Sequence, residues 1–269
     1  MMIFSAAKGP PYQASFRTMS NESRLDLRVN FNRTRAFLYG ESVFTTIRVE
    51  EGRPLFEKWH FERLLKSAEW LWPNTAQQAQ ILIENLKPPG LRGVWRLTLT
   101  AQVKARDSQG EMELILDDWW NEEIPEVKSL NLKNVKSPAR PELWPTFLKS
   151  GDYLSRMVAA RHLAPDELAL FHVNEKICEL LHANIFFIRS QKIITPTLSA
   201  NTLEGIGRRR IMQMLDIEEC EVDVNELKEV TSAFGVNALR GILPVEKIDG
   251  KKLERHSMIT ELQREFFRC

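Results

Sequence analysis

Lys149 is the first residue of this chain whose type and setting suit chemistry. It follows the apolar pair Phe147-Leu148 and precedes a predicted helix that Asp152 can cap. The positions that follow at helical spacing are Leu154, Met157, Val158 and Arg161. We expect them to turn one helix face inward and to place the amine at a buried entrance. Such an amine is either a surface group with a buried aliphatic stem or a nucleophile of lowered pKa, suited to Schiff-base formation.

Other residues of chemical interest are scattered along the chain, and each has an ordinary structural alternative. Arg63, in His60-x-x-Arg63-Leu64, is by itself typical of an ion pair on a helix surface. Glu179 alone is typical of an outward-facing charge on an edge strand. Asn184 precedes an apolar strand and suits a bend between strands, and Gly205-Ile206-Gly207 opens a predicted helix.

Several kinds of site lack their sequence signatures. The five histidines show no paired ligand spacing, so we expect no metal site. The chain also has no Walker loop, no Gly-x-Gly-x-x-Gly sequence and no Gly-x-Ser-x-Gly sequence. The common nucleotide-binding and hydrolase classes therefore lose support.

Composition limits the partners and the compartment. The 37 basic and 36 acidic side chains nearly cancel, so we expect neither nucleic acid nor a membrane as a partner. Cys178, Cys220 and Cys269 are odd in number and widely spaced, which argues against a disulfide framework. No apolar run approaches the roughly 18 residues of a spanning helix. We expect a soluble, cytoplasmic protein.

The hydrophobic pattern predicts an N-terminal α/β domain over residues 1–117, a linker over 118–125 and a C-terminal α/β domain over 126–269. The strands expected in the first domain are 25–31, one ending at Val49, 54–56, 93–100 and 112–116, and the helices are 59–71 and 75–87. The strands expected in the second domain are 129–134, 168–173, 177–181, 185–189, 193–196, 219–224 and 233–237, with helices ending near 163, 215, 230 and the C-terminus. The runs between 168 and 196 are typical of consecutive antiparallel strands.

Six segments, taken in order, resemble the fold-type IV pyridoxal-phosphate enzymes, the class IV aminotransferase superfamily. They are Phe37-Leu38-Tyr39-Gly40-Glu41-Ser42-Val43-Phe44, His60-x-x-Arg63-Leu64-x-x-Ser67-Ala68, Lys149 with Tyr153-Leu154, Glu179-x-x-x-x-Asn184-Ile185-Phe186, Thr195-Pro196 and Leu203-x-Gly205-Ile206. The resemblance covers nearly the whole chain. It implies an α/β (α+β-like) fold of two domains, as in D-amino-acid aminotransferases, with pyridoxal 5′-phosphate at the domain junction. It also implies a homodimer that acts on a small-molecule substrate.

The resemblance also implies roles in binding the cofactor. Lys149 would hold it covalently and then move the proton on the substrate carbon that carries the amine. Arg63 and the backbone N–H groups of Ile206 and Gly207 would hold the phosphate. Glu179 would face the pyridine nitrogen. Members of the family often carry a hydroxyl residue where this chain has Gly207, so one side-chain contact to the phosphate is absent here.

Two further residues are cofactor-binding candidates by the same resemblance. Tyr153 matches an aromatic residue that contacts the ring hydroxyl in family members, and core packing is its alternative. Asn184 belongs to the Glu179 motif, and fixing the bend between strands is its alternative.

Local features favour one reaction within the superfamily. Thr45-Thr46 stands where aminotransferases usually carry glutamate before threonine, and Asn237-Ala238-Leu239 resembles the lyase pattern. The implied reaction eliminates pyruvate from 4-amino-4-deoxychorismate to give 4-aminobenzoate, a folate precursor. Thr46, or else Thr45, would assist proton transfer, and Asn237 and Leu239 would shape the substrate pocket.

The substrate of this reaction carries carboxylates, which need a cation in the site. Arg106 is the candidate cation, and Arg240 departs from the small or apolar residue usual at its position. The alternatives are a class IV aminotransferase, of branched-chain or D-amino-acid type, and an inactive relative that binds the cofactor.

Overall fold

The computed structural model describes residues 34–102, 113–124, 126–140, 142–189, 192–199 and 201–268. All of them belong to one compact unit, Asn32–Cys269. The strand expected over 25–31 and the candidate Arg106 lie outside the described residues.

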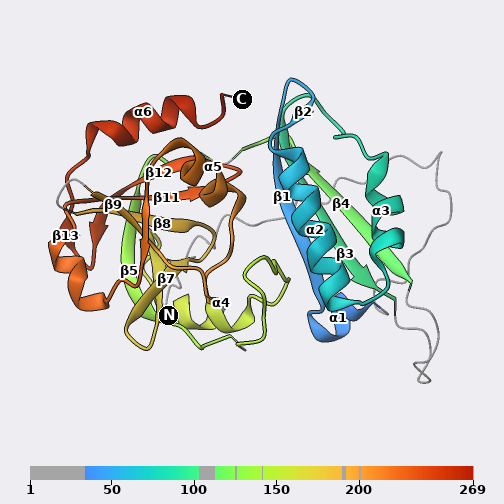
Figure 1. Ribbon diagram of the computed structural model, residues 1–269, viewed down its shortest axis with the longest axis horizontal. Coiled ribbons are helices and arrows are strands. Elements are labelled where there is room, and N and C mark those ends of the chain that lie inside the picture. Colours follow the sequence, from blue (N-terminus) through green and yellow to red (C-terminus); the bar gives the residue numbers. More distant parts are fainter. Residues whose placement is uncertain are drawn as a thin grey trace, which may run out of the picture. The chain divides into compact units, whose positions relative to one another are not determined.

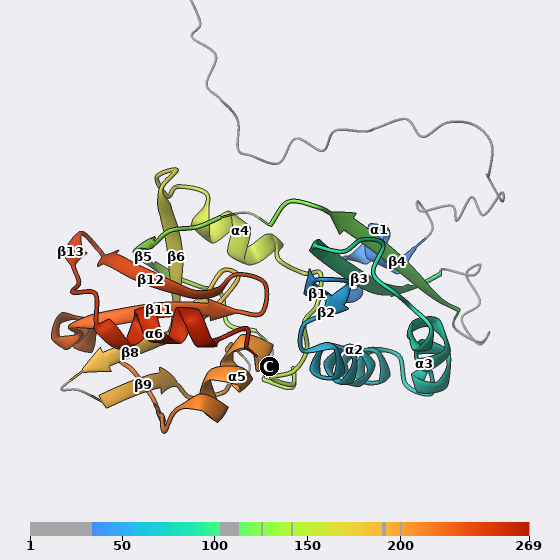
Figure 2. The ribbon, with the colours of Figure 1, turned by 90° about the horizontal axis from the view of Figure 1, so that it is seen from above.

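The first described sheet has four antiparallel strands in the order β2-β1-β3-β4. They are β1 (Ser42–Glu50), β2 (Arg53–Pro54), β3 (Gly93–Ala101) and β4 (Leu114–Asn121). The short helix α1 (Arg35–Tyr39) precedes β1, and α2 (Glu57–Leu71) and α3 (Ala76–Glu84) lie together on one face of the sheet (Figures 1 and 2). The core there includes Val43, Ile47, Leu64 and Ala68, because alternate residues of β1 face the apolar side of α2.

The second described sheet has the order β10-β9-β8-β11-β12-β5-β6-β7, with β13 on β12. Its strands are β5 (Leu130–Lys136), β6 (Glu167–Val173), β7 (Lys176–Leu180), β8 (Asn184–Arg189), β9 (Lys192–Pro196), β10 (Glu218–Cys220), β11 (Ser232–Asn237), β12 (Gly241–Ile248) and β13 (Lys251–Lys252). The remaining helices are α4 (Leu154–Ala160), α5 (Ile206–Met214), the 3₁₀ helix η2 (Val224–Glu229) and α6 (Ser257–Glu265). Buried side chains fill both sides of the central strands, among them Phe187 and Phe234.

Two predictions about this sheet were wrong. The strands between 168 and 196 do not form one continuous antiparallel series, because β8 pairs with β11 and β9 rather than with β7. The sequence reasoning also missed β12, which pairs antiparallel with β11 and parallel with β5. Pro244 lies within β12, and proline usually argues against a central strand.

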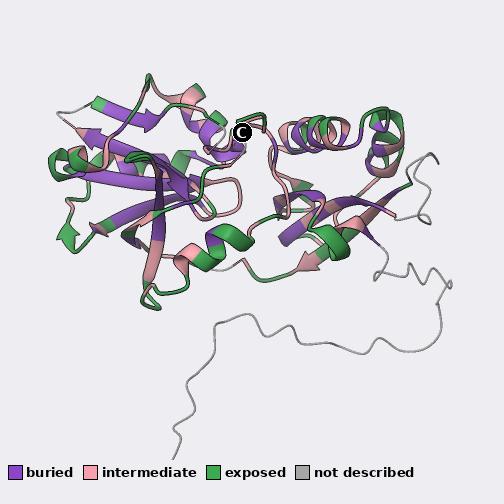
Figure 3. Cartoon of the chain, turned by 90° about the horizontal axis from the view of Figure 1, so that it is seen from below, coloured by how far each residue is buried: buried purple, intermediate pink, exposed green. Residues whose placement is uncertain are grey.

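Helix α4 differs from its prediction in its cap and in its orientation. Tyr153, not Asp152, is the N-cap residue, and no side-chain hydrogen bond caps the first turn. The apolar positions expected to face inward are exposed instead: Leu154, Met157 and Val158 (Figure 3). The buried residue of this helix is Arg156.

Strand β4 is longer than expected and continues to Asn121, through residues assigned to the linker. Strand β5, in the other sheet, begins at Leu130. The division into domains at 118–125 stays a prediction.

Candidate active site

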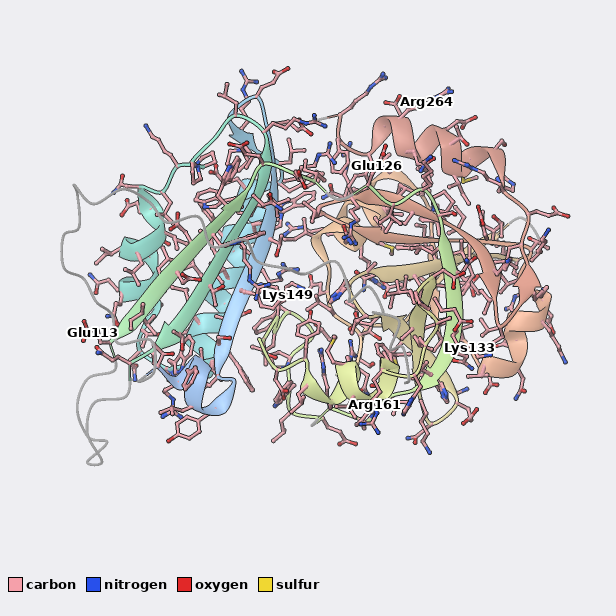
Figure 4. All side chains as sticks on the ribbon, turned by 180° about the vertical axis from the view of Figure 1, so that it is seen from behind. Glu113, Glu126, Lys133, Lys149, Arg161 and Arg264 are labelled. Carbon is pink, nitrogen blue, oxygen red and sulfur yellow. The ribbon has the colours of Figure 1, made fainter. Side chains whose placement is uncertain are left out.

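Lys149 is fixed against strand β1 by backbone hydrogen bonds. Its carbonyl oxygen accepts from the N–H of Phe44 at 3.0 Å, and the N–H of Gly151 donates to Ser42 at 2.9 Å. Ser150 between them forms a bridge with Val43. The segment therefore extends the pairing of β1 beyond the short strand β2, and it places Lys149 beside β1 (Figure 4).

The Lys149 amine lies in an aromatic and cationic setting. Its Nζ donates to Tyr153 Oη at 3.1 Å and lies 4.6 Å from the centroid of the Phe44 ring. Desolvation lowers the pKa of Lys149, and the charge of Arg63 lowers it further, although Tyr153 acts in the opposite direction. Burial raises the pKa of Tyr153, but the nearby Lys149 charge outweighs this and the pKa falls below its ordinary value. A lowered amine pKa increases the fraction of neutral, nucleophilic amine near pH 7.

Glu179 is a buried carboxylate held on both oxygens. Arg156 Nη1 donates to Oε1 in an ion pair with both side chains buried. Oε2 accepts from the N–H of Leu203 at 2.8 Å and lies 3.5 Å from Asn184 Nδ2. The outward-facing alternative for Glu179 is therefore wrong. These contacts fix the carboxylate in place, where it can face a ring nitrogen.

Arg156 is a site residue that sequence reasoning missed. It lies on the side of α4 opposite the apolar positions, a pattern typical of a solvent-exposed face. Its second amino group donates to the Asn201 carbonyl at 2.8 Å, and its Cζ lies 5.2 Å from the centroid of the Phe171 ring. No local signal identifies it, because all these partners are distant in sequence.

Arg63, on α2, is a buried guanidinium without a buried anion. One of its amino groups donates to Thr45 Oγ1 at 3.2 Å, and its Nε has no hydrogen-bond partner among the described residues. Desolvation lowers the pKa of Arg63 to about 10. The surface ion pair offered as its alternative is absent from the described part of the chain; Glu62 pairs with Arg209 instead. A cation in this state fits an anionic ligand.

The two threonines of β1 face opposite sides of the strand. Thr45 is fully buried, and its Oγ1 lies 2.5 Å from His60 Nδ1, on the side of α2. The pKa of His60 is well below its usual range because the ring is desolvated, and Arg63 and Lys149 lie nearby. Thr46 is partly exposed and pairs across the sheet with Arg96. The Thr45 hydroxyl is thus occupied by His60 and Arg63. Thr46 stays the candidate for proton transfer.

The beginning of α5 supplies free backbone N–H groups at Ile206 and Gly207. A Cβ at Gly207 would lie 2.8 Å from the Asn237 backbone, so the close approach of α5 to β11 requires glycine. This explains why no hydroxyl residue occupies the position. Asn184 Nδ2 donates to the Leu203 carbonyl at 2.8 Å, so its side chain positions the turn before α5; a role in the bend between strands stays a prediction.

Asn237 organises the turn between β11 and β12. Its Oδ1 accepts from the N–H groups of Leu239 and Arg240, at 3.1 and 2.7 Å, and its Nδ2 donates to the His182 carbonyl at 3.1 Å. The carbonyl of Leu239 accepts from Arg48, on β1, at 3.2 Å. The side chain of Asn237 therefore positions the two residues that follow it. No cluster of metal-ligating side chains occurs in the parts of the chain that the structure describes.

Comparison with known proteins identifies the class. The model of the amino-transferase class IV family matches residues 42–248, and the chain belongs to this family. The fold and the pyridoxal 5′-phosphate cofactor expected from the sequence are those of the family, so both predictions are confirmed. No helix in the described residues is long and apolar enough to cross a membrane.

Individual relatives divide between two activities. The chain is 27% identical over 234 residues to the aminodeoxychorismate lyase of Bacillus subtilis, with 79% of each chain covered. It is 27% identical over 271 residues to a probable branched-chain-amino-acid aminotransferase of Aquifex aeolicus, covering 87% of this chain and 85% of the relative. Among solved structures, a putative 4-amino-4-deoxychorismate lyase from Legionella pneumophila is 26% identical with a TM-score of 0.69, over 86% of this chain and 91% of that one.

The residues of the site fit the family's cofactor. A phosphate needs cations and N–H donors, which Arg63, whose Nε has no partner among the described residues, and the beginning of α5 offer. A protonated ring nitrogen needs a buried carboxylate, which Glu179 offers. An aldehyde needs a neutral amine, which the lowered pKa of Lys149 favours.

Proposed function

We propose that this protein is a pyridoxal-phosphate-dependent lyase that converts 4-amino-4-deoxychorismate into 4-aminobenzoate and pyruvate, a step that feeds folate biosynthesis. The observation that carries the proposal is the Thr45-Thr46 pair. Threonine stands at position 45, where the aminotransferases usually carry glutamate, and the hydroxyl of Thr46 lies on the same side of β1 as Phe44, whose ring contacts Lys149. The Asn237 turn, with its resemblance to the lyase pattern, supports the same reaction.

Residues from both sheets and from their connecting segments would bind the cofactor. Lys149 would hold it covalently, Arg63 with the N–H groups of Ile206 and Gly207 would bind its phosphate, and Glu179 would pair with its ring nitrogen. When bound, the cofactor withdraws electrons from the carbon that carries the substrate amine. Tyr153 reaches the same space through its hydrogen bond to Lys149.

The elimination requires one proton to leave the ring and one to reach the leaving group. Lys149, released by the substrate amine, would take the proton from the ring carbon that bears this amine. The bond from the neighbouring ring carbon to the enolpyruvyl oxygen then breaks, and the ring becomes aromatic. Thr46 would assist the proton transfer that converts the leaving enol into pyruvate. Leu239 and Asn237 shape the pocket wall.

An aminotransferase is the second candidate function, because branched-chain aminotransferase relatives match the chain at the same identity as a lyase. The two reactions share the binding of the cofactor and the first proton transfer. They differ in whether an amino acid alone leaves its amino group on the cofactor.

The experiment that separates them uses purified protein loaded with pyridoxal 5′-phosphate. We expect pyruvate and 4-aminobenzoate in equal amounts from 4-amino-4-deoxychorismate, and no spectral change with L-leucine, D-alanine or L-glutamate alone. Conversion to the pyridoxamine form with an amino acid, together with no pyruvate release, would assign the aminotransferase. Borohydride reduction without a covalent label at Lys149 would leave only an inactive relative.

We also propose a cytoplasmic homodimer whose interface covers the exposed apolar faces of α1 and α4. These faces carry Phe37, Leu38, Tyr39, Leu154, Met157 and Val158, which are 45% to 73% exposed. Apolar side chains gathered in this way are typical of an interface rather than of an isolated surface. Light scattering of the purified protein tests the dimer, and Leu154→Asp with Met157→Asp should give a monomer.

A further inference from the structure

Arg240 lies on the turn between β11 and β12, next to the groups that surround Lys149. Its backbone N–H is bound by Asn237, and Asn237 also binds the carbonyl of His182. The His182 ring packs at 5.7 Å, centroid to centroid, on Tyr153, which accepts the hydrogen bond from Lys149. A continuous series of contacts therefore joins the turn of Arg240 to the lysine.

A second cation faces the same space from strand β3. The Cζ of Arg96 lies 3.7 Å from the centroid of the Phe44 ring, and the amine of Lys149 lies 4.6 Å from that centroid. The charges of Lys149, Arg240 and Arg96 reach His182 as well. Desolvation, followed by these charges, lowers the pKa of His182 to about 4. The space beside the lysine is therefore strongly positive.

Two other arginines in contact with this region are already used. Arg48 binds Glu50 and the Leu239 carbonyl, and Arg156 binds Glu179 and the Asn201 carbonyl. Arg240 differs from both. Within the described residues its side chain forms no ion pair, and its buried Nε, like that of Arg156, has no hydrogen-bond partner.

We propose that Arg240 binds a carboxylate of the substrate and that, because the charge of Arg96 also acts on this region, the site selects an amine that carries two carboxylates. The inference rests on the proposed function and names its carboxylate-binding residue. A guanidinium matches a carboxylate in two parallel hydrogen bonds, and it binds most strongly where water is excluded. The substrate of the proposed lyase carries one carboxylate on its ring and one on its enolpyruvyl group. Arg240 would thus take the role of carboxylate-binding cation for which the sequence suggested Arg106.

The loss expected on removing the guanidinium follows from the strength of a charged hydrogen bond. Hydrogen bonds to charged groups contribute about 1.5–3 kcal/mol, which corresponds to roughly a 10- to 100-fold change in affinity. Arg240→Met should therefore raise the KM for the substrate by that factor and leave kcat within about threefold. Arg240→Lys should recover part of the loss because it keeps the charge and loses the fork.

A binding experiment that needs no turnover tests the inference. Calorimetry on the cofactor-loaded protein would compare two unreactive probes, benzene-1,3-dicarboxylate and benzoate. We expect the dicarboxylate to bind at least tenfold more tightly, and Arg240→Met to abolish this preference. Arg268→Met is the matched control, since Arg268 is exposed and pairs only with Glu265 in the described chain. Melting temperature and cofactor absorbance verify that each variant is folded and loaded.

The outcomes separate the inference from the function on which it rests. A dicarboxylate preference lost in Arg240→Met, in a protein that releases no pyruvate, would support the anion site and reject the lyase. Pyruvate release with an unchanged KM in Arg240→Met would overturn the inference and keep the lyase. Equal binding of the two probes by the unsubstituted protein would also overturn it.

Discussion

The two buried charges that we assign to the two ends of the cofactor are stabilised in opposite ways. Glu179, on β7, is neutralised within the chain by Arg156 and by the N–H of Leu203. Arg63, on α2, donates to a hydroxyl and forms no ion pair among the described residues. The charge of the carboxylate is therefore compensated within the chain, whereas the guanidinium is open to an anionic ligand. We infer that the ring end of the site is built by folding and the phosphate end is completed by binding.

The largest expected effect concerns the ring end. Arg156→Met would leave Glu179 buried without its cation, and breaking a buried pair costs about 3–5 kcal/mol. We expect urea unfolding of the cofactor-free protein to show a loss of this size. The double variant Arg156→Met with Glu179→Leu should recover most of it, since no charge is then left unpaired. A small loss in the single variant would show that Arg156 does not hold the carboxylate.

The phosphate end should respond in the opposite way. Arg63→Met removes a desolvated cation, so the cofactor-free protein should lose less than about 1 kcal/mol. The affinity for pyridoxal 5′-phosphate should fall by about 100-fold, because a charge-assisted phosphate contact is lost. Equilibrium dialysis measures the affinity, and Arg209→Met, which breaks an exposed pair with Glu62, is the control. An equally large loss in the cofactor-free protein would remove the contrast with Glu179.

A substitution at Gly207 tests how closely α5 packs against β11 at the phosphate end of the site. Gly207→Ala places a methyl group 2.8 Å from the Asn237 backbone, and such overpacking costs about 1–3 kcal/mol. We expect this loss in thermal unfolding, together with weaker cofactor binding as α5 shifts. Gly250→Ala is a control for the loss of glycine, since its Cβ would meet no atom within 4 Å, although its positive φ adds a strain of its own. Full stability of Gly207→Ala would contradict the close approach of α5 and β11.

A further test is a pH dependence at the His182 ring, on the side where the cations lie. Desolvation lowers the pKa of His182 to about 4 from an ordinary value near 6.5, so between these values the unfolded chain binds more protons. Stability should therefore rise with pH between about 4 and 6.5. His182→Asn should flatten this rise, and NMR titration of the imidazole measures the pKa directly. Arg240→Met should raise that pKa; an unchanged value would place Arg240 away from the ring.

Much of the site was accessible from local sequence. Lys149, Arg63, Glu179 and Gly207 were named from their residue types and order, and in the structure the charges of Arg63 and Glu179 act on the Lys149 amine. Their roles stay predictions. Strand β3 follows from an alternating or apolar run, and β6 from a short apolar run bounded by turn signals.

What the sequence alone determined were features that depend on neighbours along the chain, namely residue types, alternation and the starts and ends of helices. Only the tertiary structure decided which distant groups meet. It placed Arg156 on Glu179, directed Thr45 toward Arg63, paired β8 with β11, and left the apolar face of α4 exposed. The physical reason is that burial and charge pairing are set by strands and helices packed from far apart, and periodicity along one segment carries no information about its partner.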